Sequence, residues 1–444
     1  MNAVVRSANG AERALADQFA QAASRLPGNA GVATMRARAF EAFAREGLPH
    51  RRLEQWKYTD LRNVMQTALP VAPAPDAAAL DRAAKAVKSH SFEGVRKLVM
   101  VDGFFAPSLS DLSNLEGGLT IRSLASVLKD DAGVHDLLAS DDAGAGAMFA
   151  LNSALMTDGV VIEIAENAPP ARPLHIVHVM SGRSATAAYT RSMVRVGATK
   201  TNATLVESFI DLGENIAHQI NDALIIAMAD DVRLDHVRLM EDNRAAINVS
   251  TLKAVVGANT HFNTFNMTTG GALSRYQMFI RCAGSGGRVD TNGVNLLNGQ
   301  QHGDTTLFMD HAVQGCPSRE NFRAVIDDRA RSVFQGRILV RREAQQTDAK
   351  MMTRALLLSD EAEADNKPEL EIFADDVSCG HGATAGALDE SLLFYLRARG
   401  LPEKEAQALL IQAFVGEAIE AIVDDRLRDA AIAAAVRWLE ARDA

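Results

Sequence analysis

Residues 223–267 read ALIIAMADDVRLDHVRLMEDNRAAINVSTLKAVVGANTHFNTFNM, and this stretch decides the fold. It contains four segments rich in β-branched and aliphatic residues, separated by short clusters of Asp, Asn, Ala or Gly. The segments are Ala223–Met228, Val232–Met240, Val249–Val256 and Thr260–Met267. Because no segment with a helical period lies between them, the pattern predicts consecutive β-strands and disfavours alternating βα units.

The same pattern continues on both sides of this stretch. Further predicted strands are Val160–Ile164, Leu174–Val179, Ser192–Val196, Thr204–Ile210, Gln277–Arg281, Val294–Leu297, Thr305–Met309, Phe322–Ile326, Ser332–Val340, Ala355–Leu358 and Leu370–Phe373. Many short strands without helices between them are typical of a sandwich, barrel, propeller or solenoid. Asn and Gly at the turns favour a parallel β-helix with turns of roughly 20 residues. A β-sandwich split into two domains stays open as the alternative.

Helical patterns flank the β region. Apolar residues three or four apart predict one helix near Leu15–Leu26 and another over Ala30–Glu46. A Pro- and Ala-rich linker is expected over Thr67–Ala79, and further helices over Leu388–Ala444. The predicted domains are an N-terminal helical region with its linker (1–90), a connecting α/β segment (91–159), the β-helix core (160–385) and a C-terminal helical domain (386–444).

The composition is that of a globular protein, with 47% hydrophobic and 23% charged residues. The net charge of −10 disfavours nucleic acid as a partner, because binding it usually requires a clustered basic face. The first residues lack a basic stretch followed by an apolar run, and no run is long enough to span a membrane, so neither a signal peptide nor membrane insertion is expected. Three widely spaced cysteines indicate a reducing, cytoplasmic setting rather than a disulfide framework.

The clearest local chemistry lies in residues 375–384, DDVSCGHGAT. Cys379 and His381 are two positions apart, so both can point to one side of an extended segment. Thiolate and imidazole are good ligands for iron or zinc. Two ligands do not fill a tetrahedral site, so the fold or a second chain must supply the others. A structural Cys beside a loop His is the alternative interpretation.

Several separated motifs resemble the SufB/SufD family of iron–sulfur cluster assembly proteins. They are EQWKYT (54–59), AQQTDA (344–349), LLLS (356–359), PELEI (368–372), the segment 374–384 and LFYLRARG (393–400). The sequence HGAT at residues 381–384 resembles the SufD branch, whereas the SufB branch has HEAT there. SufB also has an essential cysteine in the segment that matches residues 346–349, where this chain has Thr347.

The resemblance implies a mainly β fold with α, in which a right-handed parallel β-helix is flanked by helical domains. It also implies that the chain is not an enzyme in isolation but a scaffold subunit of a SufBCD complex. This subunit is expected to pair with a SufB-like paralogue through the β-helix. Its C-terminal helices are expected to dock a SufC-like ABC ATPase. His381, helped by the nearby Cys379, is then expected to bind a transient iron–sulfur cluster shared with the partner. The residues expected in the ATPase docking region are Leu393, Phe394, Tyr395, Arg397, Arg399, Gly400 and Phe414. Whether the complex binds a flavin stays open.

Two alternatives also stay open. In a homodimeric metal-binding β-helix module, two copies of Cys379 and His381 would supply four ligands, and a homodimer is expected when the chain is alone. A β-helix polysaccharide lyase is the other alternative, but it needs paired carboxylates or a basic residue in a groove, and no such pair is recognisable. Trp56 and Tyr58 are expected to pack the N-terminal helices against the β region.

Overall fold

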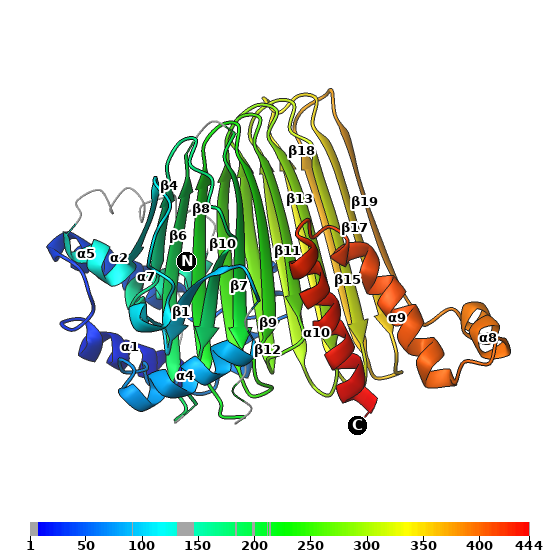
Figure 1. Cartoon of the computed structure of the whole chain (residues 1–444), viewed down its shortest axis with the longest axis horizontal. Coiled ribbons are helices and arrows are strands. Elements are labelled where there is room, and N and C mark those ends of the chain that lie inside the picture. Colours follow the sequence, from blue (N-terminus) through cyan, green and yellow to red (C-terminus); the bar gives the residue numbers. More distant parts are fainter. Residues whose placement is uncertain are drawn as a thin grey trace, which may run out of the picture.

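The computed structural model describes residues 8–90, 92–130, 146–182, 184–197, 200–210, 212 and 215–443. Two long sheets dominate the molecule, with helices at the N-terminal end and over one face near the C-terminus (Figure 1). The chain alternates between the two sheets, and strands on the same sheet run parallel through the body of each sheet. This arrangement is a parallel β-solenoid of about 8 turns, which confirms the predicted fold class and excludes the sandwich.

Within the described ranges, ten strands form sheet 1 and nine form sheet 2. Sheet 1 contains, in spatial order, β2 (Phe104–Phe105), β1 (Arg96–Val101), β5 (Leu174–Val179), β7 (Asn202–Ile210), β9 (Arg233–Glu241), β11 (His261–Thr268), β13 (Arg288–Leu297), β15 (Ser318–Ile326), β17 (Asp348–Leu357) and β19 (Ser378–Gly386). Sheet 2 contains β3 (Leu119–Ser123), β4 (Val160–Ile164), β6 (Ala187–Val196), β8 (Gln219–Met228), β10 (Ile247–Val256), β12 (Leu273–Cys282), β14 (His302–His311), β16 (Arg331–Val340) and β18 (Glu363–Ile372).

One turn of the solenoid is longer than the sequence pattern suggested. Arg233 of β9 lies beside His261 of β11, which is 28 residues further along the chain. The expectation of roughly 20 residues per turn is therefore wrong. Each turn holds two strands of up to 10 residues, and polar residues at the strand ends concealed their true length.

The interior of the solenoid is apolar along one edge and polar along the other. In β7, Leu205 lies in the apolar core between the sheets, whereas Val206 packs against the C-terminal helices outside. Because successive side chains in a strand point to opposite faces, Glu207 and Phe209 also face the interior. The later parts of several sheet 1 strands therefore bring polar side chains inside the solenoid, opposite the beginning of the sheet 2 strands, as His178 of β5 and Glu207 of β7 do.

The N-terminal helices cover parts of both sheets. They are α1 (Gly10–Ala22), α2 (Ala30–Glu46), α3 (Leu61–Val64), α4 (Ala77–Ser89), α5 (Leu124–Asp130) and α7 (Gly146–Leu155), with short 3-10 turns at Glu54–Trp56 and Pro107–Leu109. The predicted helix Ala30–Glu46 is confirmed, and Asn29 caps it by accepting a hydrogen bond from the Val32 amide at 3.1 Å. Val71 forms a bridge with Ala187, so part of the expected linker is tied to sheet 2.

The helices described after the solenoid are α8 (Glu390–Ala398), α9 (Glu403–Ile419) and α10 (Asp425–Asp443). Ile411 and Val415 of α9 and Trp438 of α10 pack against the outer face of sheet 1. In contrast, α8 has no buried residue and lies away from both sheets (Figure 1). The C-terminal helical region therefore consists of a packed pair and a projecting helix. No helix in the described ranges combines the length and apolar character needed to cross a membrane.

Candidate functional site

The C-terminal end of the solenoid is open. Among the residues that the structure describes, β19 is the last strand of sheet 1 and β18 is the last strand of sheet 2, so each pairs on one side only. Most residues of β19 are exposed. An exposed edge strand presents unpaired N–H and C=O groups, which makes it a template for pairing with another chain.

Cys379 and His381 lie on β19, at this open end. The strand register places Cys379 beside Ala349 and His381 beside Met351, and both neighbours are core residues. Alternation along the strand therefore directs both side chains toward the solenoid interior, where no further turn of the described chain covers them. His381 is exposed, whereas Cys379 is half-buried against the core. Burial raises the pKa of the Cys379 thiol.

The sequence did not predict that this segment is a strand. Gly380, Gly382 and Ala383 are poor strand formers, and Gly386 ends the element. Pairing with β17 imposes the extended conformation over the whole segment. The expectation that Cys379 and His381 share one side is consistent with the register, and their chemical role stays a prediction.

The expected docking residues occupy α8 and its junction with α9. Phe394 is 74% exposed and Tyr395 is 55% exposed, which is unusual for large apolar side chains on one short helix. Gly400 has a φ of 95°, so it ends α8 in a left-handed conformation that favours glycine. Phe414 is half-buried, and the Arg323 guanidinium lies 4.8 Å from its ring centre. The remaining positions are the half-buried Leu393 and the exposed Arg397 and Arg399.

A groove of about 420 Å³ connects the open end to these helices. Residues from β17, the end of β19, α8 and α9 line it, among them Leu356, Leu388, Leu392 and Phe414. The groove is mainly apolar. The open strand edge and the projecting helix thus belong to one continuous region of the surface.

The EQWKYT motif has a structural role. The Arg275 guanidinium lies 3.8 Å from the ring centre of Trp56 and forms a buried ion pair with Asp304, whose carboxylate also accepts a hydrogen bond from the Thr59 hydroxyl. Trp56 is buried and Tyr58 is half-buried. The motif therefore anchors the N-terminal region to the outer face of sheet 2, as expected for Trp56.

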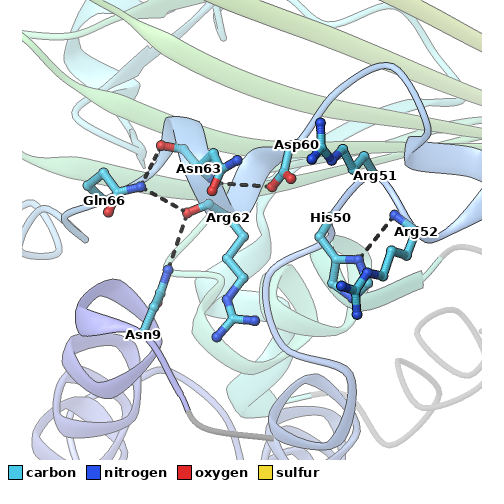
Figure 2. A pocket seen from close by; sticks show the side chains of 8 residues that line it. All are labelled: Asn9, His50, Arg51, Arg52, Asp60, Arg62, Asn63 and Gln66. Carbon is cyan, nitrogen blue, oxygen red and sulfur yellow. Dashed lines mark hydrogen bonds between the residues drawn. The ribbon is translucent and has the colours of Figure 1, made fainter.

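An open hollow of about 410 Å³ lies beside this motif (Figure 2). Its lining includes His50, Arg51, Arg52 and Arg62 together with Asp60. Figure 2 shows that polar groups of the lining bond to one another, for example the Asn63 amide to Asp60 at 3.1 Å. The hollow is wide and polar, and none of the described residues that line it is buried.

Inside the solenoid, sequence analysis missed a buried polar cluster. His178, Glu207 and Asp222 come from three strands, and one possible ligand atom of each lies within 4.8 Å of the other two. His236 is joined to Glu207 by a hydrogen bond of 3.0 Å. Glu207 follows His178 by 29 residues, and His236 follows Glu207 by 29 residues. This spacing is close to the length of one solenoid turn, and it was the only signal of this cluster in the sequence.

Cys282 and Cys316 are both buried, and the three cysteines are free thiols. A hydrogen bond from Cys282, together with the nearby His311, lowers the pKa of Cys316 although burial opposes this. The same contact raises the pKa of Cys282 well above its ordinary value.

An open-ended β-solenoid with a thiol and an imidazole on its last strand, and an exposed apolar helix beyond it, defines a class of protein suited to partner binding. The family described as "SUF system FeS cluster assembly, SufBD core domain" matches residues 178–414, and "SufBD protein N-terminal region" matches residues 11–176. The chain therefore belongs to the SufBD family of iron–sulfur cluster assembly proteins, and is SufD-like.

Relatives of this chain come from several lineages. The chain is 30% identical to the iron–sulfur cluster assembly protein SufD of Escherichia coli (strain K12), over 88% of this chain and 89% of that protein. It is 28% identical to the iron–sulfur cluster assembly SufBD family protein slr0076 of Synechocystis, over 84% of both chains. It is also 30% identical to "Protein ABCI7, chloroplastic" of Arabidopsis thaliana, over 51% of this chain and 48% of that protein.

Proposed function

We propose that this chain is a scaffold subunit of a cytoplasmic iron–sulfur cluster assembly complex of the SufBCD type. It pairs with a SufB-like paralogue and docks a SufC-like ABC ATPase, and it turns over no substrate alone. The observation that carries the proposal is the open end of the solenoid, because it combines unpaired strand edges with inward-directed Cys379 and His381.

Strand pairing is the proposed mode of association with the paralogue. β18 and β19 end the two sheets side by side, so a second solenoid can continue both sheets by backbone hydrogen bonds. Pro368 in β18 lacks the N–H that would point to the open side, so β18 offers an added strand one donor fewer, and β19 is the edge with the continuous set of donors. When the paralogue is absent, the same edges are expected to pair with a second copy of this chain.

His381 and Cys379 then form half of a binding site at the interface. Two ligands on one chain leave a tetrahedral site incomplete, and pairing brings the partner's residues opposite them. His381 is exposed at the open end, so its imidazole is available to bind or orient iron or sulfide as substrate of the assembly reaction. The half-buried thiol of Cys379, with its raised pKa, is the weaker ligand at neutral pH.

ATPase docking is assigned to α8 and its junction with α9. The apolar residues Phe394 and Tyr395 are exposed on a helix without any buried residue, and a partner would remove them from water. The residues Leu393, Arg397, Arg399, Gly400 and Phe414 surround this surface. Because α9 and α10 pack on sheet 1, movement of the docked ATPase would be transmitted to the solenoid.

The test is anaerobic reconstitution of the co-purified three-component complex, followed by measurement of bound iron and sulfide. We expect His381→Ala to leave the complex assembled but to lower cluster content by roughly tenfold or more, as for loss of a metal-site residue. His90→Ala is the matched control, since His90 is exposed at the end of α4, outside the proposed interface. Equal cluster content in wild type and His381→Ala would refute the assigned role.

A further inference from the structure

Three buried side chains converge inside the solenoid, at strands that the proposed interface does not use. His178 of β5 is 6% exposed, and Glu207 of β7 and Asp222 of β8 are each 2% exposed. One ligand atom from each lies within 4.8 Å of the other two. His and carboxylate side chains in one small volume can hold a single metal ion between two facing sheets.

Two polar atoms of this group lack hydrogen-bond partners. They are Nε2 of His178 and Oε1 of Glu207, which lie 3.9 Å apart. Buried polar atoms without partners are uncommon and point to an unfilled interaction. Metal–nitrogen and metal–oxygen bonds of about 2.0–2.2 Å allow one ion to contact two atoms at this separation.

The surrounding residues orient the three side chains. Oε2 of Glu207 accepts a hydrogen bond from Nε2 of His236 at 3.0 Å, and the other ring nitrogen of His236 lies 2.9 Å from the Thr264 hydroxyl. Oδ1 of Asp222 accepts a hydrogen bond from the Thr190 hydroxyl at 2.5 Å. Such outer contacts are what metal-binding carboxylates usually have.

The charges of the site favour a cation. Glu207 and Asp222 place two carboxyl groups in one small buried volume, and the attraction between a carboxylate and a cation is strongest where water is excluded. The nearby Arg238 guanidinium donates hydrogen bonds to the side chains of Asn266 and Ser250, at 2.9 Å and 3.0 Å.

We propose that His178, Glu207 and Asp222 bind one divalent first-row transition-metal ion inside the solenoid. His236 is a positioning residue for Glu207. One imidazole and two carboxylates suit Fe²⁺, Mn²⁺ or Zn²⁺, and the absence of a thiolate from the group disfavours Cu⁺. The site is independent of the proposed partner interface, because all three ligands belong to this chain.

Co²⁺ is the probe that tests the proposal. The isolated full-length chain is freed of metal with a chelator and titrated with Co²⁺ while its absorption spectrum is recorded. We expect one bound Co²⁺ with the visible bands of nitrogen and oxygen coordination, and without the near-ultraviolet band of a thiolate ligand. The signal should persist when Cys282, Cys316 and Cys379 are all replaced by Ser.

Variants assign the signal to particular residues. We expect His178→Gln and Glu207→Gln each to weaken Co²⁺ binding at least tenfold, and His236→Gln to weaken it about 10–100-fold. Asp242→Asn is the matched control, because Asp242 forms another buried pair with Nε2 of His218 at 2.7 Å. The affinity of this variant for Co²⁺ should equal that of wild type. Circular dichroism shows which variants fold. If a variant does not fold, the Co²⁺ absorption spectrum of the wild-type chain still tests whether the chain binds the ion.

Three results would overturn the proposal. The first is a wild-type chain that binds no Co²⁺. The second is a thiolate band that disappears with Cys379→Ser, because this would place the ion at β19. The third is unchanged affinity in folded His178→Gln and Glu207→Gln.

Discussion

Glu320 shows how strongly single residues respond to the solenoid interior. It lies on the same face of β15 as Phe322, which belongs to the apolar core, and it is 1% exposed. Burial raises the pKa of its carboxyl group to about 8. His175 is also buried, and burial lowers its pKa to about 3. Both groups are therefore neutral near pH 7, which avoids an unpaired charge inside the molecule.

The raised pKa of Glu320 makes the stability of the protein dependent on pH. Between the ordinary value of 4.5 and about 8, the folded chain holds this proton and the unfolded chain releases it. This contribution to the free energy of unfolding therefore falls as pH rises through that window, by at most about 1.4 kcal/mol per pH unit. When the pH rises from 6.5 to 8, we expect the free energy of unfolding to fall in both proteins. The fall in Glu320→Gln should be smaller than that in wild type by roughly 2 kcal/mol.

Urea unfolding of both proteins at the two pH values measures this difference. Other titrating groups, including Cys316, are common to both chains, so the difference isolates Glu320. An identical loss of stability in wild type and variant would contradict the raised pKa.

At the scale of elements, β19 and α8 share an unusual degree of exposure. β19 pairs with β17, and the Ser378 amide at its start donates a hydrogen bond of 2.8 Å to the carbonyl of Thr347, the residue before β17. In a parallel pair the backbone groups of successive residues point to alternate sides, so the amide of Ala383 points away from β17. It is a donor available to an added strand.

Ala383→Pro removes this donor without breaking the bonds to β17. We expect the isolated variant to keep a circular dichroism spectrum like that of wild type but to lose association with the SufB-like paralogue, measured by co-purification. Ala383→Val is the control, because it keeps the amide and favours an extended strand. Retained association of a folded Ala383→Pro chain would exclude pairing through β19.

α8 gives a second prediction at this scale. Phe394→Asp places a charge on the exposed apolar surface, and we expect it to weaken ATPase binding at least tenfold in a pull-down titration, while pairing with the paralogue is unchanged. Val423→Asp is a control of similar character, since Val423 is 51% exposed but lies between α9 and α10. If both variants bind the ATPase like wild type, docking does not use α8.

The sequence predicted some elements better than others, for physical reasons. The predicted bounds of β4 and β5 agree with the structure because apolar residues fill both strands. The prediction of β6 began at Ser192 rather than Ala187, because buried polar residues such as Thr190 and Arg191 interrupt the pattern. For the candidate sites, adjacency in sequence revealed Cys379 and His381, whereas the interior metal ligands come together only through the register of separate turns.

At the scale of the whole molecule, the two ends of the solenoid differ. At the N-terminal end, β2 and β3 pair antiparallel with β1 and β4, and helices cover the neighbouring faces. At the C-terminal end, no strand in the described ranges lies beyond β18 and β19. Repeat folds usually need capping elements at both ends. A partner solenoid would supply the missing cap, which links the fold directly to assembly.

The measurement that tests this account most directly is the mass of the species formed with the SufB-like paralogue and the SufC-like ATPase, by size-exclusion chromatography with light scattering. We predict one species containing all three chains, and a homodimer of the 47.6 kDa chain when it is alone. Elution of this chain as a 47.6 kDa monomer in the presence of authentic partners would contradict the scaffold role.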